Sequence, residues 1–499
     1  MASMRFWTSM KRTHMIILKP NAILQRRNYS RNLFSKISPL GHPTISLVPV
    51  IDKWVQGGKK IEGPELKAII KDLRARKRYS QALEVSEWMS SKRRITFSPG
   101  DLAMQLDLIG RVHGVECAES YFQNLNDQDK TDKTYGALLN CYVREGLVDK
   151  SLHHMKKMKK LGFASSTLTY NDLMCLYYKT GQQEKVINVL SEMKENDISP
   201  DNYSYRICMT SCAARDDLSG VEKLLEEIEN QPDISLDWLT CSTVANIYIT
   251  AGLKERALVY LKKCEELVGK NSLGYNHLIS LHASLGNKDE MMRIWGLKKA
   301  KCKKEFNKDY ITMLGSLVNI GELEESKKLL QEWESSALCY DFRVPSVVLI
   351  GYCKKGLVEK AEAILRDIEE KKQKRPTPNS WAIIAAGYVD KQNMEKAFQC
   401  MKEALTVQTE NKGWRPKGCL ISSILSWLGD NGNVEDVESF VNLLEAKVPK
   451  DREIYHTLIK VYIRGGKQVD RLLESMKADN IHEDEETKTI LSLGQKSAE

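Results

Sequence analysis

The clearest absence in this 499-residue chain is that of acidic side chains from its first 51 residues. Between Met1 and Ile51 there is no Asp or Glu, whereas eight Lys and Arg residues and many Ser and Thr residues are present. A basic, hydroxylated and acid-free segment is typical of a peptide that directs a protein into a mitochondrion or a chloroplast. A solvated basic tail without a targeting role is the alternative interpretation.

The segment Arg27-Asn28-Tyr29-Ser30 is similar to a plant mitochondrial processing pattern, with an arginine in the third position before a cut after Tyr29. We therefore expect a transit peptide over residues 1–29, a linker over 30–62 and a mitochondrial location, with the chloroplast as the alternative. Cleavage would lower the net charge of +9 by six, to +3. Any nucleic-acid binding by the mature chain must then depend on local patches of charge.

Other absences narrow the function. No apolar run reaches the roughly 18–20 residues that a membrane-spanning helix needs, so no membrane insertion is expected. The twelve cysteines form no C-x-x-C pair, and the sequence contains no H-x-E motif. A zinc-dependent deaminase would need both. No phosphate-binding glycine loop or nucleophile constellation occurs either. The sequence predicts a protein that is not an enzyme and that has no metal and no cofactor.

The feature that is present throughout the chain is a repeat of about 35 residues. A small or branched residue that begins a hydrophobic helix recurs at intervals of 33 to 40 residues. These anchor positions are Ala82, Ala118, Ser151, Val186, Val221, Ala257, Met291, Ser326, Ala361, Ala397, Val437 and Arg471. Five residues before many of them stands a glycine, which suits a helix end because it adopts a left-handed conformation without strain. These glycines are Gly146, Gly181, Gly252, Gly286, Gly321, Gly356, Gly432 and Gly466.

Each unit is predicted to be a pair of amphipathic helices. In residues 167–201, Tyr170, Leu173 and Tyr177 share one helical face, Gly181 ends that helix, and Pro200 closes the second one. Neither short helix can bury its apolar stripe alone, so neighbouring units must stack. The fold predicted is all-α, a right-handed α-solenoid of about twelve helix-turn-helix repeats, followed by a tail over residues 485–499. The expected units are 63–98, 99–131, 132–166, 167–201, 202–237, 238–271, 272–306, 307–341, 342–377, 378–417, 418–451 and 452–484.

Several segments carry a family pattern. Tyr170-Asn171, Gly181 and Ile198-Ser199-Pro200-Asp201 are similar to the Thr-Tyr-Asn, Gly and Lys-Pro-Asp elements of the pentatricopeptide repeat, and Gly274-Tyr275-Asn276-His277-Leu278-Ile279 repeats the first of them. The chain thus resembles a P-type pentatricopeptide repeat protein of plant organelles over about 85% of its length. The resemblance implies first helices on a concave face, with each unit recognising one base of single-stranded RNA.

The resemblance also implies particular contacts. The fifth and last residues of a unit would bind the base edge, and its second residue would stack beside the base. The pairs that fit are Asn171/Asp201, associated with uracil, Ser242/Asn271, associated with adenine, and Ser422/Asp451, closer to a guanine type. Basic residues late in the first helix would meet phosphate. They are Arg144, Lys179, Lys354 and Arg464.

Departures from the pattern are as informative. Phe306 and Ile311 cannot hydrogen-bond a base edge, and Gly136 and Ala382 have no side-chain donor. Asn171 and Asp201 have a structural alternative, because such residues also cap helices. The run Lys298–Lys304 either faces RNA or is a solvated helix face, and we favour the solvated interpretation because the run lies in the second helix and loop of its unit.

Two functions follow from the resemblance. The first is an organellar adaptor that binds single-stranded RNA in RNA processing, stability or translation. The alternative is a structural component or scaffold of the mitochondrial ribosome with little sequence-specific readout, which the incomplete base-reading pairs favour. The partners expected are single-stranded organellar RNA and, for the alternative, the mitochondrial ribosome or other RNA-processing proteins.

Overall fold

A computed structural model describes residues 33–41, 45–58, 60–91, 96–231, 234–336, 340–370, 374–407, 414–445 and 447–495. Every regular element in these ranges is helical, which confirms the all-α prediction. The chain divides into two compact units, residues 1–260 and 261–499. The predicted transit peptide over residues 1–29 lies outside the described residues. Within the ranges that are described, no helix combines the length and hydropathy needed to cross a bilayer.

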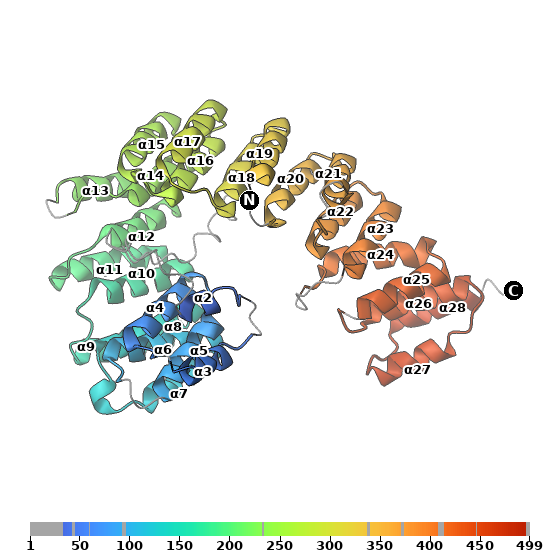
Figure 1. Ribbon diagram of the computed structural model, residues 1–499, viewed down its shortest axis with the longest axis horizontal. Coiled ribbons are helices and arrows are strands. Elements are labelled where there is room, and N and C mark those ends of the chain that lie inside the picture. The colour runs from blue at the N-terminus through green and yellow to red at the C-terminus, as the bar shows by residue number, and fades with distance from the viewer. Residues whose placement is uncertain are drawn as a thin grey trace. The chain divides into compact units, whose positions relative to one another are not determined.

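The first compact unit begins with α2 (Leu33–Ile37) and α3 (Val48–Gln56) and continues as helical hairpins (Figure 1). Its hairpin helices are α4 (Gly63–Ala75), α5 (Tyr79–Ser91), α6 (Pro99–Val112), α7 (Val115–Gln123), α8 (Asp132–Glu145), α9 (Val148–Lys160), α10 (Thr167–Lys179), α11 (Gln183–Glu195), α12 (Asn202–Ala213), α13 (Leu218–Glu229) and α14 (Trp238–Thr250). A short 3₁₀ helix, η2 (Asp127–Asp129), precedes α8. The boundary with the second unit falls within α15 (Lys254–Val268).

The second compact unit has the same construction. Its helices are α16 (Ser272–Ser284), α17 (Lys288–Lys301), α18 (Asn307–Asn319), α19 (Leu323–Ser336), α20 (Arg343–Lys354), α21 (Val358–Glu370), α22 (Pro378–Asp390), α23 (Met394–Thr406), α24 (Gly418–Asn431), α25 (Val434–Glu445), α26 (Arg452–Arg464), α27 (Asp470–Ala478) and α28 (Glu485–Gln495). First helices pack side by side in series, α16 on α18, α18 on α20 and α20 on α22.

The hairpin of α10 and α11 shows why such a unit forms. The Ser166 hydroxyl accepts a hydrogen bond from the Thr169 N–H at 3.3 Å and so caps the start of α10. Gly181, with φ of +76°, turns the chain after that helix. Tyr170 from α10 and Val186 from α11 are buried in the apolar core. The core thus lies between the two helices of a hairpin and between neighbouring hairpins.

The segment predicted as a linker, residues 30–62, contains packed helices. Leu33, Ile37, Leu47 and Ile51 from this segment are buried in the same core as the repeats. Side chains of α5 hold the segment in place, since Glu84 accepts a hydrogen bond from the Leu47 N–H at 2.7 Å. The first hairpin exposes one apolar side, and these helices cover it.

Within the segment predicted as a tail, the described residues 485–495 form a helix. Helix α28 packs on α26, in the position that the first helix of a further repeat would take. Ile490 of α28 joins Tyr455, Ile459 and Met476 in a small apolar cluster. The eleven residues of α28 are fewer than a complete repeat contains, but they suffice to cover the apolar face of α26.

Candidate nucleic-acid interface

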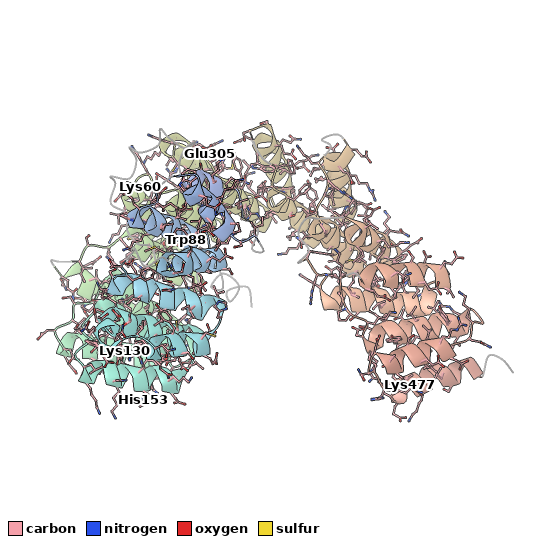
Figure 2. The ribbon with its side chains drawn as sticks, turned by 60° about the horizontal axis from the view of Figure 1, so that its bottom comes forward. Lys60, Trp88, Lys130, His153, Glu305 and Lys477 are labelled. Atoms are coloured by element: carbon pink, nitrogen blue, oxygen red, sulfur yellow. The ribbon has the colours of Figure 1, made fainter. Side chains whose placement is uncertain are left out.

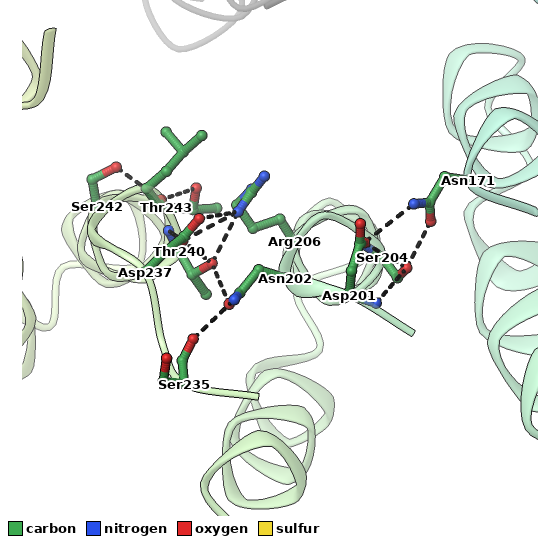
Figure 3. Close-up of polar contacts among 11 residues, drawn as sticks. Asn171, Asp201, Asn202, Ser204, Arg206, Ser235, Asp237, Thr240, Ser242 and Thr243 are labelled. Carbon is green, nitrogen blue, oxygen red and sulfur yellow. Dashed lines mark hydrogen bonds and ion pairs between the residues drawn. The ribbon is translucent and has the colours of Figure 1, made fainter. Parts of the chain in front are cut away.

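The predicted pair Asn171 and Asp201 is brought together by the packing of α10 against α12 (Figure 3). The Asn171 amide donates from Nδ2 to Oδ1 of Asp201 at 3.2 Å, and its Oδ1 accepts from the Ser204 hydroxyl at 2.7 Å. Asn171 is 2% exposed, whereas Asp201 is exposed. Both polar groups of the amide are therefore engaged within the protein.

Asp201 also has the structural role considered as the alternative. Its carboxylate accepts a hydrogen bond from the Ser204 N–H at 2.8 Å, and the Ser204 hydroxyl accepts one from the Asp201 N–H at 3.1 Å. This reciprocal arrangement is a capping box at the start of α12. One carboxylate thus caps a helix and fixes the asparagine of the preceding repeat.

The next fifth-position residue, Arg206, shows the same geometry with different chemistry. Its Nη1 lies 3.2 Å from each carboxylate oxygen of Asp237 and donates to the Thr240 hydroxyl at 3.1 Å. Asp237 caps α14 by accepting from the Thr240 N–H at 2.7 Å. The guanidinium is neutralised by the residue that would share base recognition with it, as Figure 3 shows.

The other two predicted pairs are arranged differently. The Ser242 hydroxyl is buried and donates to the Leu239 carbonyl at 2.9 Å, while Asn271, in the second compact unit, caps α16. The Ser422 hydroxyl donates to Glu453 at 2.6 Å rather than to Asp451, which caps α26 through the Ile454 N–H at 3.1 Å. Of the three pairs, the structure joins only Asn171 and Asp201 by a direct hydrogen bond within the described residues.

Three of the four predicted phosphate-binding cations contact the preceding repeat. The Lys179 ammonium donates to the Val143 carbonyl at 3.2 Å, and Arg464 donates to the Gly429 carbonyl at 2.9 Å. These carbonyls lie near the C-terminal ends of α8 and α24, where carbonyl groups lack helical partners and attract cations. Lys354, at the end of α20, is exposed.

Of these four cations, Arg144 is the one that is buried and ion-paired within the protein. Its side chain is 5% exposed, and its Nη1 lies 3.2 Å from Oδ1 of Asp107 in the preceding repeat. Burial raises the pKa of Asp107, but the hydrogen bond and charge of Arg111, with the charges of Arg74 and Arg144, bring it below its usual value. Arg144 is thus part of a buried ion-pair cluster and a poor candidate for phosphate binding.

Sequence reasoning missed the third residue of the units. Fifth-position side chains bond to this residue of the following repeat, where a carboxylate or hydroxyl recurs: Asp101, Ser204, Thr240, Asp309 and Thr487. A hydroxyl or carboxylate three residues after a capping residue was the available signal, because it is the signature of a capping box.

The interpretation of the whole run Lys298–Lys304 as solvated is wrong at its first residue. Lys298 is 0% exposed and forms an ion pair of 2.9 Å with Asp309. Its ammonium also lies 5.1 Å from the centre of the Trp295 ring. Lys303 and Lys304 are exposed, as expected.

Comparisons with known proteins agree with the repeat pattern. Residues 165–214 match the model of the PPR repeat family, and residues 133–163 and 346–372 match the PPR repeat model. A mitochondrial pentatricopeptide repeat-containing protein of Arabidopsis thaliana is 50% identical over 95% of this chain and 97% of its own length. A second one from the same plant is 34% identical over 87% of this chain and 91% of its own length.

Among solved structures, the maize pentatricopeptide repeat protein PPR10 aligns with a TM-score of 0.50 at 16% sequence identity. The alignment covers 92% of this chain and 65% of that one, so this chain spans just under two thirds of the maize protein's length. This likeness concerns the fold and confirms the predicted α-solenoid class.

Proposed function

Because this chain belongs to the pentatricopeptide repeat family, we propose that it is a non-catalytic adaptor that binds single-stranded RNA in the mitochondrion. Its role would be in RNA processing, stability or translation. The mitochondrial location is supported by the names of the two relatives and by the acid-free basic segment over residues 1–51. The chloroplast is the alternative location.

The observation that carries this proposal is the hydrogen-bonded group of Asn171, Asp201 and Ser204. An amide has both a donor and an acceptor, and a carboxylate has acceptors only. The edge of uracil likewise presents a donor, its N3–H, between two carbonyl acceptors. A uracil would bind this group by replacing the internal hydrogen bond between Asn171 and Asp201, while Ser204 keeps both side chains in position.

A strand bound in this way would run along the first helices, from one repeat to the next. Three repeats hold Asn171, Arg206 and Asn276 through bonds to the following repeat, so these side chains are already ordered before RNA arrives. Preorganised groups lose little conformational entropy on binding. The bound strand would be shielded from nucleases, or a neighbouring segment would be kept open for a ribosome.

The second candidate is a structural component of the mitochondrial ribosome. It is favoured by the engagement of Arg144 with Asp107 and of Arg464 with the carbonyl of Gly429. Cations that stabilise the solenoid in this way contribute little to the recognition of an RNA strand by its sequence. Such a component would hold RNA through its shape and local charge.

Selection of bound RNA from a randomised pool tests the first function. We expect the double variant Asn171→Ser, Asp201→Asn to change one selected position from uracil to adenine, because it recreates the pair implied for adenine. The binding free energy of the variant should favour adenine over uracil at that position by about 1–3 kcal/mol, the usual size of discrimination by a base-specific contact. Asparagine also caps helices, so α12 should remain intact. Asn188→Ser, an exposed position on α11, is the control.

Sedimentation of mitochondrial lysate with and without ribonuclease separates the two functions. Migration with one ribosomal subunit, together with no change in selected sequence for the double variant, would favour the ribosomal role. Migration with ribonuclease-sensitive particles outside the ribosome supports the adaptor. Failure of the chain to associate with RNA in either assay would refute both.

A further inference from the structure

The last residue of most repeats has a structural task at the following first helix. Its side chain accepts a hydrogen bond from a backbone N–H two or three residues further along the chain, and so caps that helix. Residues with this role are Ser98, Ser166, Asp201, Asp237, Asn271, Thr377, Asp451 and Asp484. In the repeat over residues 272–306 this place is taken by Phe306, whose ring can accept no such bond.

At this junction only one half of the capping box is present, and Asp309 supplies it. Its carboxylate accepts a hydrogen bond from the Phe306 N–H at 2.9 Å, three residues before it. Asp309 is itself buried, and it is held by Asn276 at 2.7 Å and by Lys298 at 2.9 Å. Helix α18 therefore begins without any contribution from the side chain of Phe306.

The side chain of Phe306 is also not part of the apolar core. It is 62% exposed, the highest value among the large apolar side chains that the structure describes as exposed. Burial of a phenyl ring is strongly favourable, and Tyr275 and Tyr310 in the neighbouring first helices are buried. Neither capping nor packing accounts for a phenylalanine at this position.

In the same repeat, the other member of the base-reading pair is a buried amide. Asn276 occupies the fifth position, but it is 5% exposed and its Nδ2 donates to Asp309. Phe306 is therefore the accessible member of the pair. A phenyl ring offers a face on which any of the four bases can stack.

Charge around Phe306 suits a nucleic-acid backbone. Lys303, Lys304 and Lys308 are all exposed, and Glu305 is the one acidic residue among them. Glu305, which is labelled in Figure 2, marks this segment between α17 and α18. An aromatic side chain flanked by exposed cations is the combination with which proteins bind single strands regardless of sequence.

We propose that Phe306 is a stacking platform for one nucleobase of single-stranded RNA, and that Lys303, Lys304 and Lys308 bind the adjoining phosphates. This inference rests on the proposed function and adds to it a repeat that binds without selecting its base. The strand would be bound at Phe306 without selection of the base, and its sequence would be recognised by other repeats. A base of either size would fit, because stacking requires only a flat face.

Binding of fluorescein-labelled oligouridine and oligoadenosine, each of 20 nucleotides, to the mature full-length chain tests this inference. Stacking on an aromatic residue is worth about 1–3 kcal/mol per base, so Phe306→Ala should weaken binding by about 5- to 150-fold with both oligonucleotides. Phe306→Trp should keep or strengthen binding. Val259→Ala, a change at an exposed apolar residue of the second helix α15, should leave it unchanged.

Two further measurements keep the result interpretable. The melting temperature of Phe306→Ala should equal that of the natural chain, because the ring is exposed and the bond from the backbone N–H of residue 306 to Asp309 does not involve the ring. Photo-crosslinking with 5-bromouridine RNA should modify the tryptic peptide of residues 305–308, which contains Phe306.

The outcomes distinguish this inference from the function on which it rests. Equal affinity of Phe306→Ala and the natural chain for both oligonucleotides, or crosslinks confined to other peptides, would overturn the stacking platform while RNA binding stands. Loss of a bound protein by Phe306→Ala, without loss of RNA, would also overturn it. Absence of any RNA binding by the natural chain would instead remove the proposed function itself.

Discussion

At the scale of single residues, one buried carboxylate connects three helices of the second compact unit. Asp309 in α18 accepts hydrogen bonds from Ser272 and Asn276 of α16 and pairs with Lys298 of α17. Burial raises the pKa of Asp309, but its bonds to the Phe306 N–H, Asn276, Lys298 and Ser272 bring it below its usual value. The carboxylate is therefore charged, and it needs its cation.

We expect Lys298→Met to destabilise the chain by about 3–5 kcal/mol, because removing one partner leaves a buried charge unpaired. Thermal unfolding measures the effect. The matched control is Lys299→Met, since Lys299 is partly exposed and pairs with Glu332 at the surface. That pair should contribute less than about 1 kcal/mol. Equal effects of the two changes would show that the Lys298 pair is not a stabilising element.

A second buried carboxylate lacks such a cation. Asp172 in α10 accepts a hydrogen bond from Asn140 Nδ2 at 2.9 Å and is buried. The pKa of Asp172 is raised to about 7. Burial is the main cause and the charge of Asp107 adds to it, while the Asn140 bond and the charge of Lys179 act in the opposite direction. The folded state therefore holds a proton that the unfolded chain releases near pH 4.

Because the folded-state pKa is raised, the folded chain binds more protons than the unfolded chain between about pH 4 and pH 7. The contribution of Asp172 to the free energy of unfolding is fully present below pH 4 and is lost as the pH rises toward 7. We expect Asp172→Asn to remove this part of the pH dependence, so that the variant gains more melting temperature relative to the natural chain at pH 8 than at pH 5. A constant difference across this range would contradict the raised pKa.

At the scale of the helical hairpin, the turn after most first helices contains a left-handed residue. Gly181 has φ of +76° there, and the equivalent position of the repeat over residues 378–417 is Gln392 with φ of +60°. A side chain in this conformation costs about 1–2 kcal/mol. The sequence predicted this turn from the periodic glycines, and it could not show that Gln392 adopts the same conformation.

We therefore expect Gln392→Gly to raise the melting temperature of the chain, through the relief of about 1 kcal/mol of strain. The reciprocal change, Gly181→Ala, should lower it by a similar amount, since no neighbouring atom lies within 4 Å of an added Cβ and only backbone strain is introduced. Differential scanning calorimetry of both variants checks the two signs. A stabilising Gly181→Ala change would contradict the assignment.

Gly432 differs from the other periodic glycines. Its φ is −73°, so it is not left-handed. A Cβ at this position would lie 2.7 Å from the Leu428 carbonyl oxygen, so close approach rather than conformation excludes a side chain. Periodicity located this glycine, and only the packing reveals why it is needed.

At the scale of the whole molecule, both ends of the array are covered. Helices α2 and α3 bury the side of the first hairpin, and α28 buries that of the last. In α28, Thr487 hydrogen-bonds His456 at 2.8 Å and Asp484 at 2.8 Å. Repeat arrays are stabilised by nearest-neighbour interfaces, so a cover acts mainly on the repeat beneath it.

We expect deletion of residues 485–499 to expose α26 and accelerate its amide hydrogen exchange, while exchange in α16 to α20 stays unchanged. Hydrogen–deuterium exchange with mass spectrometry resolves the two regions. Lys488→Ala, a change at an exposed residue of α28, is the control and should alter neither. Uniform acceleration through the second compact unit would contradict nearest-neighbour stabilisation.

The sequence by itself determined the repeat and its helices. A period of about 35 residues, the apolar stripes and the glycines are local properties, and each hairpin is made by residues close together in the chain. The sequence also identified Asn171 and Asp201, thirty residues apart, as the fifth and last residues of one unit.

Only the tertiary structure decided which polar side chains are available. Arg144 and Lys298 are both cations in the sequence, and each is committed to a carboxylate from a neighbouring repeat. Phe306 is left exposed, although it stands where most repeats have a helix-capping side chain. These outcomes depend on contacts across repeat junctions and on burial there. A periodic pattern specifies that such junctions exist, but it does not specify which partner each side chain finds.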